Sequence, residues 1–503
     1  MHTNYSQAST PLLDALWECA NKNHAPFYTP GHKRGKGISQ RLADCFGADV
    51  FRADLPELPQ LDNLFAPQAV IQSAQELAAE AFGAQRTWFL VNGSTCGVEA
   101  AILATCGEGD KIILPRNVHY SAIAGLILSG AMPIFVYPEY DRVLDIAHSI
   151  TPDGVAAALK QHPDALAVMI VYPTYYGVCG DVKAIASIAH QHNIPLLVDE
   201  AHGAHFAFHP ELPPPALAAG ADLSVQSIHK VLGAMTQASM LHIQGNRIDV
   251  DRVSKTLQLL QSTSPSYLLL ASLDAARQQM ALQGKELMAR TLQLADTARN
   301  RISQIPGLSV LQPVGETPGF VTLDRTRLTV TVSGLGITGF EADEILHQEL
   351  GVTAELPSLD HLTFIITLGN TQADIEQLVQ AFTTLADLKA GKAGEAGEAG
   401  GEKPITNYLE RRSSATSLPI TNSLISPREA FFASTETLPI EQTSDRISAE
   451  LICPYPPGIP VLMPGEVITP EAIDYLQHIQ ATGGVISGCA DPSLKQLKVV
   501  TRS

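Results

Sequence analysis

The chain has 503 residues, 45% hydrophobic and 17% charged, a composition typical of a folded protein of about two or three domains. Its 33 Lys and Arg residues against 51 Asp and Glu residues give a formal net charge of -18, which argues against nucleic acid or an anionic membrane as a partner. The seven scattered cysteines form no C-x-x-C pair, so neither a disulfide framework nor a zinc knuckle is expected. The N-terminus lacks the pattern of a signal peptide and no apolar run is long enough to span a membrane, which predicts a cytoplasmic protein.

The first 65 residues are rich in proline, glycine and turn formers. After a helical stretch at Pro11–Asn21 they show no long periodic segment, and we interpret residues 1–65 as an N-terminal arm.

Residues 66–304 alternate short apolar runs with helical patterns. This alternation predicts a large α/β domain around a mainly parallel sheet with helices on both faces. A long amphipathic helix, Leu273–Ile302, is expected at its end. The predicted strands are Thr87–Val91, Lys111–Leu114, Ile134–Tyr137, Ala167–Tyr172, Leu196–Val198 and Leu223–Gln226.

Three further segments follow. Residues 305–388 mix strand-like and helical patterns and predict a small α+β domain. Residues 389–424, which begin with an Ala/Gly/Glu/Lys repeat, predict a flexible linker. Residues 425–503 recover order, with a helix expected at Pro470–Thr482, and predict a C-terminal α+β domain.

The strongest local signal for chemistry is Lys230, in Ser227–Lys230, directly after the predicted strand Leu223–Gln226. Ligands of α/β folds bind at the carboxyl ends of strands. A lone lysine is usually a solvated surface charge, but partial burial beside a second basic group such as His229 lowers a lysine pKa in the direction that Schiff-base formation needs.

A carboxylate follows the neighbouring predicted strand. Asp199 comes directly after Leu196–Val198 and so is expected at the same edge of the sheet as Lys230. By itself such an aspartate caps a helix. Together with the lysine it favours a pyridoxal-phosphate (PLP) site, because that cofactor needs a carboxylate beside its ring nitrogen.

Two further segments fit an anionic, planar cofactor. Ser94 and Thr95 lie in Asn92–Gly97, between a strand and a helix, where free backbone N–H groups make an anion nest, although such a turn also serves as a simple cap. His119 follows the strand Lys111–Leu114 and could stack on a planar ring, although a lone histidine is more often structural.

Other site classes lack support. His202, His205 and His209 lie close together, but their loop offers no regular ligand face, and we expect no metal. The chain also lacks the P-loop, dinucleotide-binding and G-x-S-x-G serine-hydrolase motifs.

Several segments, in this order along the chain, resemble the Orn/Lys/Arg decarboxylase family, the bacterial fold-type I group that acts on ornithine, lysine or arginine. The resemblance covers most of the chain, and the order makes it specific. The segments are Pro30–Lys33 (PGHK), Asn92–Thr95 (NGST), Val198–Gly203 (VDEAHG), Ser227–Lys230 (SIHK), Ser262–Tyr267 (STSPSY), Pro454–Gly458 (PYPPG) and Pro464–Glu466 (PGE).

The resemblance implies the PLP-dependent transferase (aspartate aminotransferase) type fold and three catalytic residues. Lys230 would hold PLP as a Schiff base, Asp199 would pair with the ring nitrogen, and His119 would stack on the ring. His202 would stand beside the ring's phenolic oxygen, at a position where related enzymes often carry tryptophan. The implied phosphate ligands are Ser94, Thr95, Ser227, His229 and, from a second subunit, Ser262 or its neighbour Thr263.

The implied reaction is decarboxylation of a basic amino acid to an amine that feeds polyamine metabolism. Shorter relatives often use arginine or lysine, giving agmatine or cadaverine, so both rank above ornithine. Larger relatives carry an N-terminal wing that builds decamers, and a chain starting without one is expected to form a homodimer or a dimer of dimers. The candidates for reading the substrate's distal charge are Glu57, Asp62, Glu355 and Glu466.

Two alternatives remain open at this stage. An aminotransferase or desulfurase on the same fold would need an arginine for the substrate carboxylate, and Arg325 or Arg327 could serve. A catalytically inactive regulatory paralogue would be expected to have lost Lys230 or Asp199, and both are present.

Overall fold

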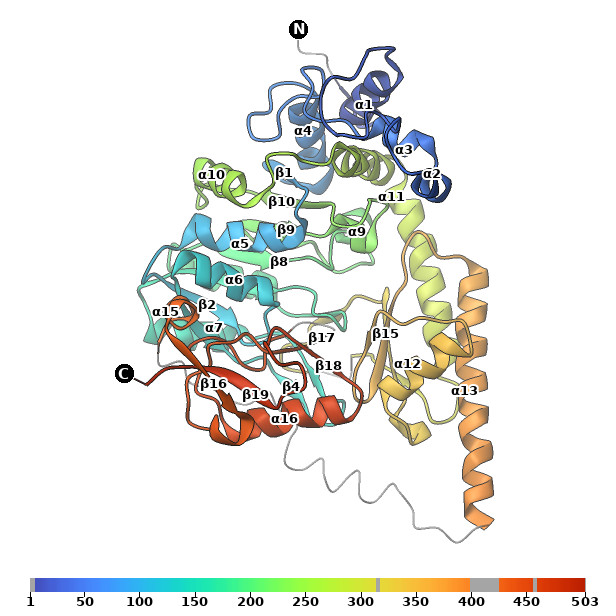
Figure 1. The fold of residues 1–503 in the computed structure, drawn as a ribbon. Coiled ribbons are helices and arrows are strands. Elements are labelled where there is room, and N and C mark those ends of the chain that lie inside the picture. Colours follow the sequence, from blue (N-terminus) through green and yellow to red (C-terminus); the bar gives the residue numbers. More distant parts are fainter. Residues whose placement is uncertain (1–4, 314–316, 399–424, 456–458, 503) are drawn as a thin grey trace. The chain divides into compact units, whose positions relative to one another are not determined.

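The computed structural model describes residues 5–313, 317–398, 425–455 and 459–502 (Figure 1). Two compact units emerge from its contacts. The first comprises residues 1–105 and 189–289, and the second comprises residues 106–188 and 290–503.

The sheet strands of the first unit lie in the order β1-β10-β9-β8. β8 and β9 are parallel, so their carboxyl ends lie at one edge, whereas β10 runs antiparallel to both β9 and β1. β10 was not predicted from the sequence. The bounds are β1 Arg86–Leu90, β8 Leu196–Asp199, β9 Leu223–Gln226 and β10 Ser239–Ile243.

Helix α5 (Gly93–Thr105) packs closely on this sheet. A Cβ atom at Gly97 would lie 2.6 Å from Val225 Cγ1 and 2.7 Å from Leu90 Cδ1, so glycine sets how near the helix can come. The other helices of the unit are α1 Pro11–Asn21, α2 Gln40–Phe46, α3 Ala48–Ala53, α4 Val70–Phe82, the 3-10 turn η1 Phe206–Phe208, α9 Ile228–Val231, α10 Val250–Leu260 and the first part of α11 Tyr267–Ile302.

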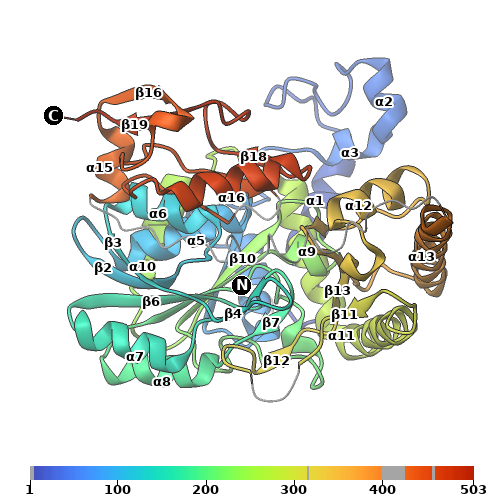
Figure 2. The ribbon, with the colours of Figure 1, turned by 90° about the horizontal axis from the view of Figure 1, so that it is seen from below.

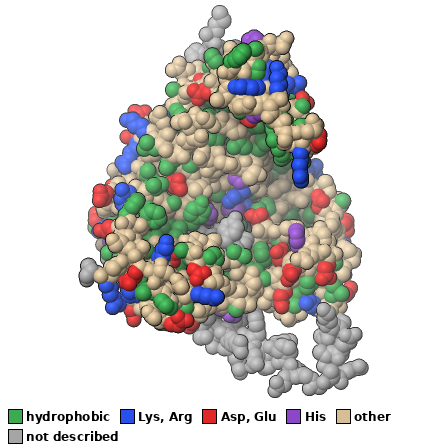
Figure 3. Space-filling model, viewed as in Figure 1, with side chains coloured by type: hydrophobic (Ala, Val, Ile, Leu, Met, Phe, Trp, Pro, Cys, Tyr) green, Lys and Arg blue, Asp and Glu red, His purple; other side chains and the backbone are tan. Residues whose placement is uncertain are grey.

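The N-terminal arm is held at its first helix. The buried carboxylate of Asp274, on α11, accepts hydrogen bonds from the backbone N–H groups of Leu12 and Leu13. The following stretch, 21–54, contains α2 and α3 but no buried residue, and Phe27 is 96% exposed. Lys and Arg side chains stand at the surface of this arm at the top of Figure 3.

The first part of the second unit contains a parallel sheet in the order β6-β2-β3. β2 is apolar and almost wholly buried, as expected for a strand with neighbours on both sides. The elements here are β2 Lys111–Pro115, α6 Tyr120–Ser129, β3 Met132–Val136, β4 Tyr140–Asp141, β5 Ile146–Ala147, α7 Pro152–Gln161, β6 Ala165–Val171, β7 Val178–Cys179 and α8 Val182–Gln191, which ends just past the unit boundary.

A four-stranded antiparallel sheet, in the order β11-β13-β15-β14, packs with α12 and α13 around its own apolar core (Figure 2). α13 continues past residue 388, where the sequence predicts a linker, and 399–424 lie outside the described residues. The bounds are β11 Ser309–Val310, β12 Thr322–Leu323, β13 Arg327–Thr331, η2 Ser333–Leu335, α12 Gly339–Gln348, β14 Leu356–Pro357, β15 His361–Ile365 and α13 Gln372–Glu398.

The C-terminal segment has its own core and is tied to α6. Arg428 donates hydrogen bonds to the carbonyls of Ile127 and Leu128, at the end of α6. Residues 456–458 of the PYPPG motif lie outside the described residues. The bounds are α15 Pro427–Phe432, β16 Thr435–Pro439, η3 Ile440–Gln442, β17 Cys453–Tyr455, α16 Pro470–Ala481, β18 Val485–Ser487 and β19 Gln496–Val500.

None of the helices in the described part of the chain is both long enough and apolar enough to cross a membrane. All seven cysteines are free thiols.

Candidate active site

Lys230 lies one turn after the end of β9. Ser227 precedes the short helix α9 (Ile228–Val231), and the helix presents Lys230 at the carboxyl edge of the sheet. Nζ of Lys230 lies 3.1 Å from Nε2 of the buried His202. The sequence predicted both residues for the site, and the structure brings them into direct contact.

Asp199 ends β8, the parallel neighbour of β9, so its carboxylate is at the same edge as Lys230. Burial raises the pKa of Asp199, while the charge of Lys230 and a hydrogen bond from Ala201 N–H lower it. An amine and a buried carboxylate therefore interact electrostatically at the carboxyl edge of the first unit's sheet.

The predicted anion nest forms the start of α5. Ser94 and Thr95 occupy the first turn of this 13-residue helix, where backbone N–H groups have no partner within the helix. The hydroxyl of Ser227 donates a 2.7 Å hydrogen bond to that of Ser94, so the residue that follows β9 meets the start of α5 at this turn. Two hydroxyls and a helix N-terminus together suit a phosphate group.

His229 points its Nδ1 atom at a carbonyl group. Nδ1 lies 3.0 Å from the oxygen of Ala238, which can only accept, so Nδ1 carries a proton and Nε2 is left for another partner. Burial, and then the charge of Lys230, lower the pKa of His229, against the raising effect of this hydrogen bond.

Ser262 lies beside the anion nest of its own chain. Its backbone N–H donates to Oδ1 of Asn92 at 3.3 Å, and the preceding Gln261 accepts a 2.8 Å hydrogen bond from Val91 N–H. Ser262 and Thr263 are both exposed. Their role as phosphate ligands of a second subunit stays a prediction.

His119 belongs to the second unit, where it caps helix α6. Its Nδ1 atom lies 2.9 Å from the hydroxyl of Ser121, and its ring lies 4.6 Å from that of Tyr120 between centroids. Its stacking on a cofactor ring stays a prediction.

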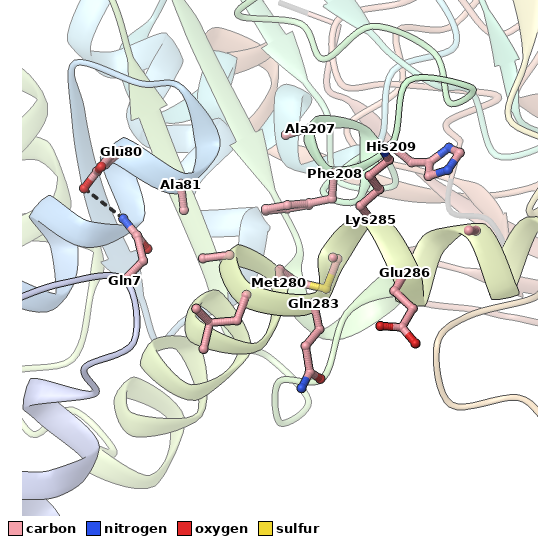
Figure 4. A pocket seen from close by; sticks show the side chains of 14 residues that line it. Gln7, Glu80, Ala81, Ala207, Phe208, His209, Met280, Gln283, Lys285 and Glu286 are labelled. Carbon is pink, nitrogen blue, oxygen red and sulfur yellow. Dashed lines mark hydrogen bonds between the residues drawn. The ribbon is translucent and has the colours of Figure 1, made fainter.

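The three nearby histidines have separate surroundings. His202 contacts Lys230 and His205 is buried, whereas His209 lines a cleft of about 700 Å³ between α11 and the 3-10 turn Phe206–Phe208 (Figure 4). Within the described ranges, no three His, Cys, Asp or Glu side chains gather as metal ligands would.

The residues present fit PLP. An amine that can bind an aldehyde, a carboxylate for a ring nitrogen, and a nest for a phosphate lie on neighbouring elements of the first unit. Sequence reasoning gave no role to one further residue, Glu200, which follows Asp199 and is fully buried. The sequence feature that could have identified Glu200 is a second acidic residue directly after an apolar strand.

Comparison with known proteins assigns most of the chain to one family. The model of the Orn/Lys/Arg decarboxylase major domain matches residues 10–368, and that of the Orn/Lys/Arg decarboxylase C-terminal domain matches residues 403–490. The chain is 40% identical to an arginine decarboxylase of Bacillus subtilis and 39% identical to one of Halalkalibacterium halodurans, each over 98% of both chains.

The solved structure of the constitutive lysine decarboxylase of Escherichia coli superposes with a TM-score of 0.82 at 22% identity, covering 98% of this chain and 82% of that one. This likeness confirms the fold class predicted from the sequence. With both family models matched and near-complete coverage of relatives at about 40% identity, the chain belongs to the Orn/Lys/Arg decarboxylase family.

Proposed function

We propose that the protein is a PLP-dependent decarboxylase of a basic amino acid, with arginine as its first substrate, and that it releases CO2 and the corresponding amine. The observation that carries this proposal is the contact of Lys230 with His202 beside Asp199, in a chain of this family. When bound, PLP supplies an electron-poor ring that accepts the electron pair of the bond to the departing carboxylate.

Each side chain of the site has a defined task in this proposal. Lys230 would hold the cofactor through its amine, and His202 would hold a proton next to that amine. Asp199 would keep a proton on the ring nitrogen, since its carboxylate is buried and close to a cationic group. Ser94, Thr95, Ser227 and His229 would hold the phosphate, Ser262 would add a hydroxyl from a second subunit, and His119 would stack on the ring.

Arginine is favoured by the relatives, since two that are 39–40% identical carry the name arginine decarboxylase. Three of the four carboxylates considered for the distal guanidinium have other partners. Asp62 accepts hydrogen bonds from backbone N–H groups such as those of Gln68 and Ala69, before α4, and Glu466 is paired with Arg116. Glu57 is exposed but accepts a hydrogen bond from the Asn63 side chain, so the exposed Glu355 is the better candidate.

The aminotransferase alternative loses its best support. Arg325 forms a 2.7 Å ion pair with Asp296, and Arg327 is fully buried beside Asp324. An arginine that receives a substrate carboxylate needs to be reachable, and these two are engaged by aspartates.

We also propose that the active form is a homodimer or a dimer of dimers, because the predicted role of Ser262 requires a second subunit. Light scattering of the purified protein tests this. A mass of two or four chains agrees with the proposal, and a decamer contradicts it.

Covalent attachment of PLP is tested by reducing the PLP-loaded protein with borohydride and mapping the modified peptide by mass spectrometry. The proposal expects modification of Lys230. Modification of a different lysine, or none in a protein that PLP fails to colour, overturns the assignment.

A further inference from the structure

Glu200 is a buried acid for which the proposed reaction has no task. Its side chain is 0% exposed, and three donors surround its carboxylate. Oε2 accepts hydrogen bonds from Ser224 Oγ at 2.5 Å and from Gln226 Nε2 at 2.9 Å, and Oε1 accepts from Ala216 N–H at 2.8 Å. Burial raises the pKa of Glu200 to about 7, against the lowering effect of these three hydrogen bonds.

The turn after β8 is built around this side chain. The N–H group of Glu200 donates to the carbonyl of Val225, in β9, and its carbonyl accepts from Gly203 N–H, both at 2.9 Å. A Cβ atom at Gly203 would lie 2.8 Å from Cγ of Glu200. The same turn carries Asp199 at its start and His202 near its end, so the hydrogen bonds of Glu200 hold the segment that bears both residues.

A chain of buried polar groups continues from Glu200 across the sheet. Gln226 Oε1 lies 3.2 Å from Nε2 of His242, in β10, and Nδ1 of His242 lies 2.8 Å from Thr87 Oγ1, in β1. Burial lowers the pKa of His242 to about 3, and its ring stacks on Phe82, so the imidazole is neutral at physiological pH.

The ionised carboxylate determines which group donates and which accepts in each hydrogen bond of this series. Gln226 gives its amide N–H to the ionised Glu200, so its oxygen must accept from His242 Nε2–H. The other nitrogen of His242 is then an acceptor for the hydroxyl of Thr87. A neutral group in place of the carboxylate allows the opposite order, with the proton of His242 on Nδ1.

We propose that Glu200 is a positioning residue for the cofactor site. Its hydrogen bonds hold the turn 199–203 against β9, and Gln226 couples its charge to the tautomer of His242. The positioning part rests on the proposed function, whereas the tautomer part concerns the protein without cofactor. The groups facing the carboxylate are Ser224, Gln226 and Ala216 N–H, and the titratable neighbours in its turn are Asp199 and His202.

Removing the acceptor tests the positioning role. Glu200→Met has a side chain of similar length and leaves three donors without an acceptor. PLP binding, measured by fluorescence titration, should therefore weaken about ten- to a hundredfold, the range for losing an outer-shell group that orients the residues of a site. In the loaded enzyme, kcat should fall while KM for the amino acid changes little. Glu200→Gln should keep PLP affinity near that of the wild type, because Gln226 and His242 can exchange their donor and acceptor roles and so keep the new amide hydrogen-bonded.

The matched control is Asp274→Asn. Asp274 is another buried carboxylate, which accepts backbone hydrogen bonds from α1 and is ion-paired with the buried Arg277. It should lower the melting temperature of the cofactor-free protein without changing the PLP affinity of the folded protein. If Glu200→Met behaves in the same way, Glu200 is a merely structural residue and the positioning role is wrong.

A second variant covers the case in which Glu200→Met does not fold. Gly203→Ala presses a methyl group against Glu200 Cγ, at 2.8 Å, and against the ring of Phe206, at 3.0 Å, and should weaken PLP binding through the same turn. Unchanged PLP affinity in a folded Gly203→Ala protein contradicts the positioning role.

The tautomer is read by NMR of cofactor-free protein with ¹⁵N-labelled histidine, with the His242 signals assigned by their loss in His242→Gln. The wild type above pH 7 should carry the His242 proton on Nε2, and Glu200→Gln should carry it on Nδ1. The same tautomer in both proteins overturns the coupling. If the wild type fails to bind PLP, the proposed function fails, and this readout still decides the coupling.

Discussion

Nζ of Lys230 lies 3.1 Å from Nε2 of His202, and the two residues come from the segments that follow two parallel neighbouring strands. An ammonium group can only donate, so Nε2 of His202 accepts and the proton of the neutral ring is on Nδ1. His202 is 5% exposed and Lys230 is partly buried, so this contact is shielded in part from bulk water. The lysine of the candidate site therefore has a built-in acceptor for the proton that its amine must lose before it can bind an aldehyde.

Lys230→Ala should abolish decarboxylation. We expect kcat to fall by about four orders of magnitude or more, the range for removing a covalent catalyst. The measurement is CO2 release by purified, PLP-supplemented protein. Lys285→Ala, at an exposed lysine of α11, is the control and should retain wild-type activity. Comparable rates in the wild type and the Lys230→Ala variant would rule out the assigned role.

Asp199→Asn should reduce kcat by about two to three orders of magnitude, as for loss of one preorganised electrostatic group. The amide keeps the shape but cannot hold the ring nitrogen protonated. Initial rates at saturating substrate measure the effect, with Asp251→Asn, at an exposed residue of α10, as the control. A variant within threefold of the wild type would show that Asp199 does not serve the ring.

PLP affinity should depend on pH through His229. Burial lowers its pKa in the cofactor-free protein, and its Nδ1 proton is given to Ala238, so Nε2 can donate to a phosphate only when the ring is charged. A bound phosphate raises the pKa of the His229 ring. The contribution of the charged ring to PLP affinity is therefore fully present below the lowered pKa of the cofactor-free protein. This contribution is lost as the pH rises through the raised pKa of the PLP-bound protein.

The corresponding measurement is the dissociation constant of PLP across about pH 6 to 9, which brackets ordinary histidine titration. His229→Gln keeps a neutral donor and should flatten the part of the pH dependence that the wild type owes to His229. Identical slopes in the two proteins would exclude a phosphate contact by His229.

The ion pair of Arg116 and Glu466 should be important for stability. Both side chains are 0% exposed and lie 3.0 Å apart, and Arg116 also donates to the carbonyls of Pro460 and Val461. Arg116→Met leaves a buried carboxylate without its counter-charge and should cost about 3 to 5 kcal/mol.

Urea unfolding measures this cost against a surface pair. Arg301 and Glu376 are 41% and 50% exposed, and Arg301→Met should cost about 0 to 1 kcal/mol. Equal losses for the two variants would mean that burial of the Arg116 pair does not govern its contribution.

The parts of the site that the sequence predicted are local. Lys230 follows β9 and Asp199 ends β8, and apolar runs flanked by turn residues identify such strand ends. Helix α1 was predicted with its observed bounds, because Pro11 and the apolar spacing after it define a helix start.

The parts that were not predicted depend on distant residues. β10 pairs with the distant strand β1 as well as with β9, and the Thr87–His242 contact joins residues 155 positions apart. Arg116 and Glu466 are 350 positions apart, and the sequence suggested a role for Glu466 only as a candidate partner of the substrate's distal charged group. Polar residues inside an apolar fold give no periodic signal, so their partners appear only once the strands are in register.

The most direct test of the central claim is CO2 release on adding arginine, lysine and ornithine separately to the PLP-loaded protein. We predict release from arginine, at a higher kcat/KM than from lysine, with ornithine lowest. A protein that binds PLP at Lys230 but releases CO2 from none of the three amino acids would contradict the account.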